Sequence, residues 1–233
     1  DEIISYSFIS PSDYDKIRMD ADDPRRDSLR ILNPLGEDRS IMRTSILPSM
    51  MDILSRNYSY RNASVRLYEI GKIYHKRPDG LADEPKVLSL GAYGGGMDFF
   101  ALKGAVETLL AAMRIPGARY ASCACENAYH PGRCAAVYVG EKRIGILGQL
   151  HPLTAGNYGM DCEVYCAELD FEAMMALRGD TPVYVPLPRF PAVTRDLSLV
   201  CAETHIHKVN RKTIKRQRRG EYIVFCFILS AKI

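Results

Sequence analysis

The sequence lacks an apolar run that could cross a membrane, and it lacks the cysteine patterns of secreted or redox-active folds. No hydrophobic stretch reaches the roughly 18 residues that a membrane-spanning helix needs. Seven cysteines are an odd number, and no pair forms C-x-x-C. Both a disulfide framework and a thioredoxin-like site are therefore disfavoured. We expect a cytoplasmic protein whose thiols are reduced and buried.

The start of the chain also lacks a targeting pattern. The opening segment, from Asp1 to Ser5, contains no basic stretch followed by an apolar one, and the chain does not begin with methionine. We expect no secretory signal, and we expect residue 1 to be internal to a longer protein. With 233 residues, 47% of them hydrophobic and 25% charged, the composition is typical of one large globular domain or two unequal ones.

Several motifs of catalysis and phosphate binding are absent. The sequence contains no recognisable Ser or Cys nucleophile elbow, no H-E-x-x-H and no prominent pair of carboxylates, which disfavours a hydrolase. The run Gly94-Gly95-Gly96 leads into a predicted helix, but that helix opens with Asp98, whose negative charge repels phosphate. Asp98 is better interpreted as the N-cap of that helix.

One cluster has spacing that could suit a metal. Cys123, Cys125, His130 and Cys134 form C-x-C-x4-H-x3-C and could supply four zinc ligands. An alternative explains them without a metal, because a Pro-Gly turn follows His130 and Cys134 begins an apolar strand where a small residue packs well. We favour the alternative and predict no metal site.

Acidic residues are scarce near the C-terminus. Residues 186–233 contain ten Lys and Arg and three acids, a net charge of +7, whereas the 21 basic and 25 acidic residues before them give −4. This asymmetry favours a polyanionic partner at the C-terminal end. A basic helix is predicted near residues 207–217, and a solvated helix face is an equally good explanation of it. The candidate residues for contact with a polyanion are Lys208, Arg211, Lys212, Lys215, Arg216, Arg218 and Arg219.

Hydrophobic periodicity predicts many short strands and few helices. We expect strands at 3–9, 29–32, 65–74, 87–93, 134–139, 143–150 and 164–169, and helices at 45–58, 98–113 and 171–178. A Pro-rich linker follows, and beyond it we expect strands at 196–200 and 223–229. This pattern indicates an α+β sheet protein, with one domain at 1–180 and a second at 181–233.

The helix predicted at 45–58 carries a stripe of apolar side chains at helical spacing. It is our candidate for a subunit interface, although a buried core helix would show the same spacing. The stripe consists of Leu47, Met50, Met51, Leu54 and Tyr58.

Four stretches together resemble the β chain of bacterial-type phenylalanyl-tRNA synthetase, and in this order they cover nearly the whole chain up to Val200. They are Asn33-Pro34-Leu35-Gly36 with Arg43-Thr44-Ser45, then Asp98-Phe99-Phe100-Ala101-Leu102-Lys103-Gly104, then His130-Pro131-Gly132-Arg133 leading to Gly145-Ile146-Leu147-Gly148-Gln149-Leu150-His151-Pro152, and finally Phe190-Pro191-Ala192-Val193-Thr194-Arg195-Asp196-Leu197.

The resemblance implies an antiparallel sheet of class II aminoacyl-tRNA synthetase type with flanking helices, followed by a partial ferredoxin-like, anticodon-binding α+β domain. The C-terminal part is shorter than the family pattern. The resemblance further implies a cytoplasmic α2β2 heterotetramer with a catalytic α subunit that binds tRNA(Phe) and uses ATP and magnesium. This chain itself is expected to hold no cofactor. The family's β chain has further N-terminal domains that this sequence does not contain.

By the same resemblance, two arginines that would neutralise ATP phosphates in an active class II domain are missing. The first should fall near His75, and the second near the stretch Leu169 to Phe171. We therefore expect a non-catalytic domain that acts as a scaffold for the catalytic subunit. Two alternatives remain: a self-sufficient amino-acid-activating paralogue that uses Arg77 as its phosphate ligand, and a generic RNA-binding module.

Overall fold

The computed structural model describes residues 1–124, 126–180, 183–184, 194–201 and 223–230. The chain divides into two compact units, Asp1–Thr181 and Pro182–Ile233. In the second unit, β11 (Thr194–Cys201) pairs antiparallel with β12 (Ile223–Ser230). The basic helix predicted near 207–217, with its seven candidate tRNA-binding residues, lies outside the described residues. No helix of the described part is long and apolar enough to cross a membrane.

The first unit is built on a six-stranded sheet in the order β3-β6-β10-β9-β8-β7, in which every neighbouring pair is antiparallel. Its strands are β3 (Ser64–Lys72), β6 (Lys86–Gly94), β10 (Val164–Asp170), β9 (Lys142–Leu150), β8 (Tyr129–Val139) and β7 (Ala118–Ser122). The β8–β9 hairpin lies inside the sheet, between β10 and the edge strand β7, and it turns through Gly140 at a positive φ of 59°.

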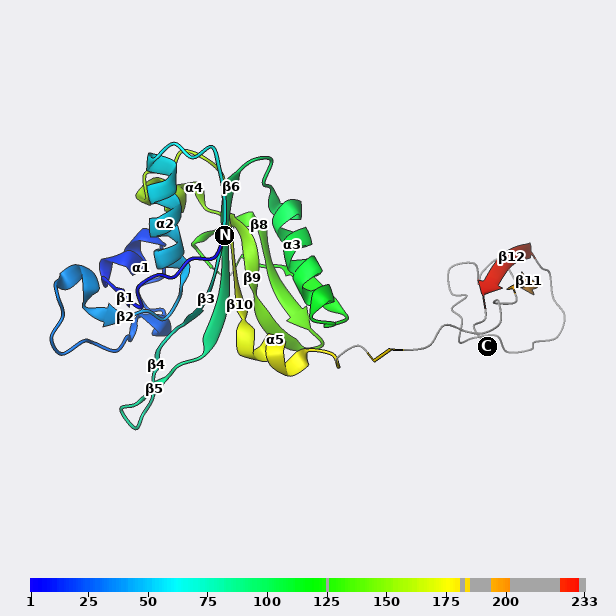
Figure 1. Cartoon of the computed structure of the whole chain (residues 1–233), viewed down its shortest axis with the longest axis horizontal. Helices are drawn as coiled ribbons and strands as arrows, with labels where there is room; N and C mark the ends of the chain where they lie inside the picture. The colour runs from blue at the N-terminus through cyan, green and yellow to red at the C-terminus, as the bar shows by residue number, and fades with distance from the viewer. Residues whose placement is uncertain (125, 181–182, 185–193, 202–222, 231–233) are drawn as a thin grey trace. The chain divides into compact units, whose positions relative to one another are not determined.

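Helices cover both faces of this sheet (Figure 1). One face packs against α2 (Leu47–Ser59), α1 (Ser12–Lys16) and α4 (Pro152–Asn157), and the other against α3 (Phe99–Ala112) and α5 (Phe171–Leu177). Alternate residues of β10 belong to the two hydrophobic clusters: Cys166 faces the α2 side, whereas Ala167 and Leu169 face the α3 side. The sheet is therefore the middle layer of three.

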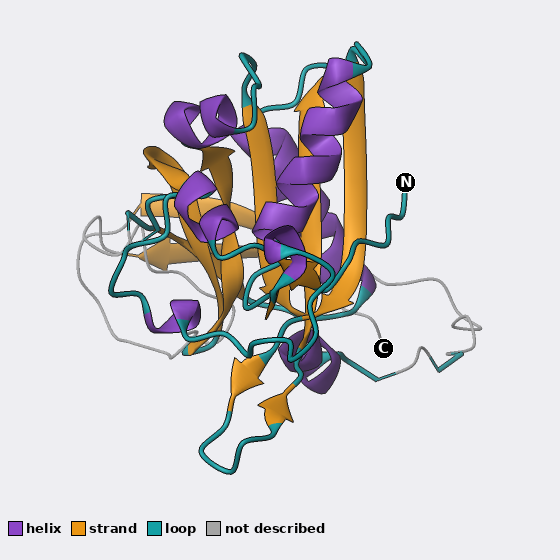
Figure 2. Ribbon diagram, turned by 90° about the vertical axis from the view of Figure 1, so that its left-hand side faces the viewer, coloured by secondary structure: helices purple, strands orange, loops and turns teal. Residues whose placement is uncertain are grey.

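The remaining short elements lie on the α2 side or project from the sheet. Two 3₁₀ turns, η1 (Pro24–Arg26) and η2 (Glu37–Arg39), precede a small ladder of β1 (Phe8–Ile9) and β2 (Ile41–Met42). The hairpin of β4 (His75–Lys76) and β5 (Ala82–Asp83) projects from one end of the sheet (Figure 2).

Two predicted N-terminal strands are largely wrong. Of the strand expected at 3–9, only β1 is a ladder strand, and the segment before it makes a single parallel bridge between Glu2 and Tyr68. The reason is that Ser5 bonds to the Arg43 and Glu69 side chains instead of joining a ladder. The strand expected at 29–32 is reduced to one bridge between Arg30 and Ile41.

The predicted helix starts are partly right. Asp98 is the N-cap of α3, because its carboxylate accepts a hydrogen bond from the Ala101 backbone N–H at 2.6 Å. α2 begins at Leu47, two residues after the predicted start at residue 45, with Ile46 in the N-cap position. The Ser45 hydroxyl still accepts a hydrogen bond from the Leu47 N–H at 3.1 Å.

Candidate functional site

A row of polar side chains crosses the sheet on the α2 side, inside a layer that is otherwise apolar. Glu69 on β3, Ser89 on β6 and Glu168 on β10 stand directly opposite one another in the strand register. A buried carboxylate is costly unless it is paired or hydrogen-bonded. The surroundings of the two glutamates therefore show what this face of the sheet is built to do.

Glu69 is neutralised by Arg43, and both side chains are at most 4% exposed. The Arg43 guanidinium donates to the Glu69 carboxylate at 2.9 Å, to the Lys72 carbonyl at 3.0 Å and to the Ser5 hydroxyl at 2.6 Å. The Ser5 hydroxyl in turn donates to the second Glu69 oxygen at 2.6 Å. Every polar atom of this pair is thus used to join the N-terminal segment to β3.

Gly71 makes room for this network. A Cβ atom at Gly71 would overlap the Arg43 guanidinium and would approach the Glu69 carboxylate to 2.8 Å. The strand has no bulge here, since Gly71 keeps its register opposite Val87. The glycine is required by a side chain, not by a backbone turn.

Glu168 caps the start of α2. Its carboxylate accepts hydrogen bonds from the Ile46 N–H at 2.8 Å, the Leu47 N–H at 3.2 Å and the Ser45 hydroxyl at 3.0 Å. Burial raises the pKa of Glu168, and the hydrogen bonds from Ile46 and Ser45 oppose that rise. A negative charge at a helix N-terminus is stabilised by the helix dipole, so Glu168 positions a helix.

A small cavity of about 40 Å³ lies beside Glu168. Arg25 borders it and is held by Asp23 at 2.6 Å and by Glu126 at 2.7 Å. The hydrogen bond from Arg25 lowers the pKa of Asp23. Tyr129 also borders the cavity, and its buried hydroxyl has no hydrogen-bond partner in the described part of the chain. This space suits a bridging water.

This arrangement is structural in character. The cations on this face are paired with carboxylates, the carboxylates bond to a guanidinium or a helix terminus, and the cavity is far smaller than the roughly 300–1,000 Å³ of ligand pockets. No nucleotide would fit there without rearrangement of the core. Sequence reasoning missed this network, because the spacing of Arg43, Glu69 and Glu168 along the chain carries no motif.

The structure shows the surroundings of the two places where phosphate-binding arginines would be expected, near His75 and near the stretch Leu169 to Phe171. Asp170 is the N-cap of α5 and accepts a hydrogen bond from the Ala173 N–H at 2.8 Å. Arg77 lies on the projecting β4–β5 hairpin, where it pairs with Asp79 at 2.8 Å with both side chains about half exposed. Asp170 is thus engaged in capping a helix and Arg77 in a surface ion pair.

The subunit interface predicted on α2 requires correction. Leu47, Met50, Met51 and Leu54 are each at most 2% exposed and belong to the hydrophobic cluster between α2 and the sheet. A partner could not reach them, so the core alternative describes these four residues. Tyr58 is half-buried and packs edge-on against Tyr93, with ring centroids 5.8 Å apart.

The histidines and cysteines have structural surroundings. His130 and His151 stack at 6.4 Å, and each Nδ1 accepts a backbone N–H two residues ahead, as expected for turn residues. Burial, Arg18 and His130 lower the pKa of His151. The described residues contain no group of three or more side chains that could hold a metal, and Cys125 lies outside them. Cys134, Cys162 and Cys166 are free thiols, as expected, whereas Cys123 is disulfide-bonded and departs from that expectation.

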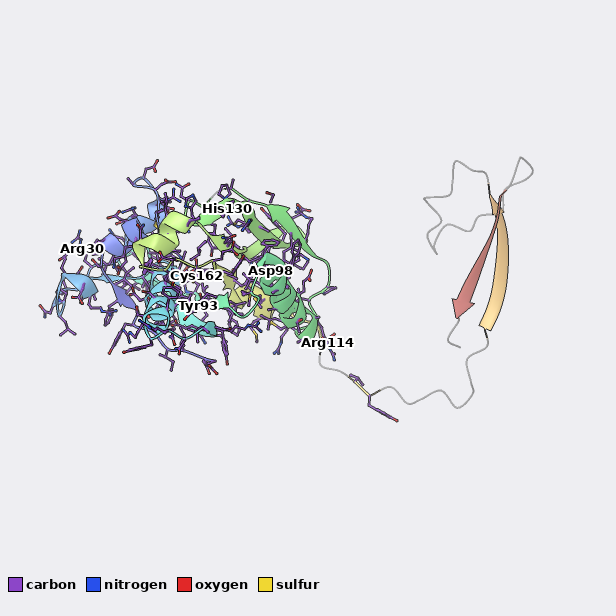
Figure 3. The ribbon with its side chains drawn as sticks, turned by 90° about the horizontal axis from the view of Figure 1, so that it is seen from above. Arg30, Tyr93, Asp98, Arg114, His130 and Cys162 are labelled. Carbon is purple, nitrogen blue, oxygen red and sulfur yellow. The ribbon has the colours of Figure 1, made fainter. Side chains whose placement is uncertain are left out.

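A second, open groove of about 510 Å³ lies at the far end of α2. Its walls come from the end of α2 and the turn that follows, the end of β6, and the loop before β10. Figure 3 shows Tyr93 and Cys162 close together beside α2. The lining residues are Tyr58, Ser59, Arg61, Asn62, Ala63, Tyr93, Gly94, Gly159 and Cys162. Sequence reasoning missed this groove as well.

Comparison with known proteins identifies the family. Residues 1–171 match the family model described as "Phenylalanyl tRNA synthetase beta chain CLM domain". The phenylalanine–tRNA ligase beta subunit of Clostridium tetani is 42% identical over 199 residues, which is 84% of this chain and 25% of that protein. The same subunit of Clostridium acetobutylicum is 38% identical over 218 residues, or 93% and 27%. The chain spans about a quarter of the length of the curated relatives it matches.

Solved structures support the fold class. A crystal structure of pyrrolysyl-tRNA synthetase from Desulfitobacterium hafniense matches with a TM-score of 0.61 at 16% identity, over 75% of this chain and 61% of that one. A second structure of an enzyme of that name and organism gives 0.60 at 13% identity, over 75% and 59%. At these identities the likeness concerns the fold alone. It confirms the predicted antiparallel sheet of class II synthetase type with flanking helices.

Proposed function

Since this chain belongs to the phenylalanyl-tRNA synthetase β-chain family, we propose that it is a non-catalytic part of a phenylalanine–tRNA ligase that supports a catalytic α-type subunit. In the complex, the α subunit would use ATP and magnesium to activate phenylalanine, while this chain would hold no cofactor. The proposal extends to the α2β2 assembly, to tRNA(Phe) as a ligand and to the cytoplasm as the location.

The observation that carries the proposal is that the charged side chains on the α2 side of the sheet are already paired with one another or bound to a helix terminus. Arg43 is committed to Glu69, Arg25 to Asp23 and Glu126, and Glu168 to the start of α2. Catalysis of adenylate formation needs cations that are free to meet phosphate charge in the transition state. Releasing Arg43 would leave the buried Glu69 carboxylate uncompensated, and releasing Arg25 would do the same to two partly buried carboxylates.

An exposed apolar surface at the edge of the sheet offers a place for the partner subunit. Tyr68 and Ile70 are exposed on the edge strand β3, and Ile4 belongs to the N-terminal segment that bridges this strand through Glu2 and Tyr68. Ile4 is 93% exposed and Ile70 44% exposed. Side chains of this kind gathered at an edge strand mark an interaction surface. We name Ile4, Tyr68 and Ile70 the β3-edge patch.

The test is light scattering after size-exclusion chromatography, with this chain alone and then with the α subunit of the same organism. We expect a stable complex that Tyr68→Asp with Ile70→Asp abolishes, while the circular dichroism spectrum of the variant stays unchanged. A matched control is Tyr60→Asp, which changes an exposed tyrosine outside the patch. If both chains are folded and do not associate, the scaffold proposal is wrong for this chain.

The self-sufficient paralogue predicts a different result. It requires Arg77 to meet the phosphates of ATP, yet this side chain pairs with Asp79 on the exposed hairpin. We expect no phenylalanine-dependent exchange of pyrophosphate into ATP by the isolated chain. Exchange that Arg77→Ala abolishes would favour the paralogue instead.

A further inference from the structure

We propose that the open groove at the C-terminal end of α2 binds a single-stranded segment of RNA, as a contact separate from the basic C-terminal region. The inference rests on the proposed function, because that function makes an RNA molecule the ligand of the complex. The inference goes beyond the proposed function by placing an RNA contact on the first unit, Asp1–Thr181.

The first argument is the composition of the chain around the groove. The 14 residues from Ile53 to Arg66 contain three arginines and two tyrosines and no acidic residue. Interleaved arginines and aromatic rings are the pattern with which proteins hold single strands, since arginine meets phosphate and every base can stack on an aromatic ring.

The second argument is that these arginines are free to meet a phosphate. Arg61 lines the groove, and within the described part of the chain it forms no ion pair with a carboxylate. Arg66 donates to the Gly95 carbonyl at 3.3 Å, at the rim beside the lining residue Gly94. The lining residue Cys162 stands between two acidic residues, Asp161 and Glu163, and Glu163 is paired with Arg133 at 3.0 Å. The local balance is therefore positive.

The third argument is shape. The groove volume of about 510 Å³ lies within the roughly 300–1,000 Å³ of small-ligand sites, enough for a nucleotide. Tyr58 is fixed edge-on against Tyr93, whose hydroxyl donates to the Asn62 carbonyl at 3.0 Å, so this wall is rigid. Tyr60 is not a lining residue, but it follows Ser59 and precedes Arg61 in sequence, and at 75% exposure its ring is free for a base beside the groove.

A thiol that lines the groove can report directly whether a ligand is bound there. Cys162 is half-buried and lines the groove, and burial raises its pKa. Its alkylation by a maleimide can be followed peptide by peptide with mass spectrometry. A ligand in the groove should slow labelling of Cys162, whereas RNA bound only to the C-terminal region should not.

The experiment uses the full chain and a labelled single-stranded RNA of about 10 nucleotides, a length within the usual site sizes. We expect saturating RNA to protect Cys162. Tyr60→Ala should weaken the binding that gives this protection by about 5- to 100-fold, and Tyr60→Phe should restore it. Arg61→Ala should lower the slope of log affinity against log salt by about 0.7. Arg30→Ala, at an exposed arginine away from the groove, is the matched control.

Two results would overturn the inference: labelling of Cys162 that RNA does not slow, or variants of Tyr60 and Arg61 that behave like Arg30→Ala. Complex formation with the α subunit is measured on the same variants and should be unchanged. If the wild-type chain forms no complex while RNA still protects Cys162, the scaffold proposal fails and the groove assignment stands.

Discussion

Arg43 is the residue on which the packing of the N-terminal segment depends. It is 1% exposed, and its guanidinium joins Ser5, Glu69 and the carbonyl of Lys72. Removing one member of a buried pair leaves the other charge uncompensated, which typically costs about 3–5 kcal/mol. We expect Arg43→Met to lower the free energy of unfolding by that amount in urea titrations.

A matched control is available at the surface. Lys72 pairs with Glu84 at 2.8 Å, and both side chains are close to half exposed. Water and salt screen such a pair, so Lys72→Met should change the unfolding free energy little. If Arg43→Met were as mild as Lys72→Met, the buried pair would contribute nothing and the account of Gly71 would fail with it.

Glu168 should make stability depend on pH. Because burial raises the pKa of its carboxyl in the folded state, the folded protein binds a proton that the unfolded chain releases near its ordinary pKa of about 4.3. Folding is therefore progressively penalised as pH rises from that value to the raised folded pKa. In Glu168→Gln the amide oxygen still accepts hydrogen bonds and the charge is gone.

The prediction is a difference between two curves. Measured by urea unfolding between pH 4 and pH 8, roughly the range in which a raised carboxyl titrates, the wild type should lose stability relative to Glu168→Gln as pH rises. The two curves should run parallel above the raised pKa. A difference that is independent of pH would mean that the hydrogen bonds from Ile46 and Ser45 keep the folded pKa at its ordinary value.

At the scale of the element, substitutions in α2 can distinguish a core helix from an interface helix. Met50 is 0% exposed and lies against Gly91 of β6. We expect Met50→Ala to lower the unfolding free energy by about 2–5 kcal/mol, the usual cost of a large-to-small change in a core. Arg56→Ala, at an exposed position of the same helix, should leave stability nearly unchanged. A stable, folded Met50→Asp that only loses its partner would restore the interface interpretation.

The same helix shows what the sequence could predict and what it could not. Periodicity located α2, α3 and the β8–β9 hairpin because these elements depend on local alternation of apolar side chains. It could not decide whether Met50 faces a sheet or a partner, since both environments select the same stripe. The N-terminal segment was mispredicted because its hydrogen bonds come from Arg43 and Glu69, distant in sequence. The groove depends on loops that only the fold brings together.

At the scale of the molecule, charge is divided between the two units. Residues 1–185 carry −4 and residues 186–233 carry +7, and the boundary between the compact units, Thr181–Pro182, lies just before the division. Most attraction for a polyanion should therefore come from the second unit. The groove beside α2 would add a short-range contact within a unit whose overall charge repels RNA.

Cutting the chain after residue 181 separates these contributions. The first unit has its own sheet and two hydrophobic clusters, so we expect it to fold with a cooperative urea transition and to bind the α subunit. Its RNA affinity should fall and depend less steeply on salt, because each lost phosphate contact removes about 0.7 from the slope for a single strand. RNA at higher concentration should still protect Cys162. A truncated chain with undiminished affinity and slope would place RNA recognition wholly in the first unit and remove the proposed role of the basic C-terminal residues.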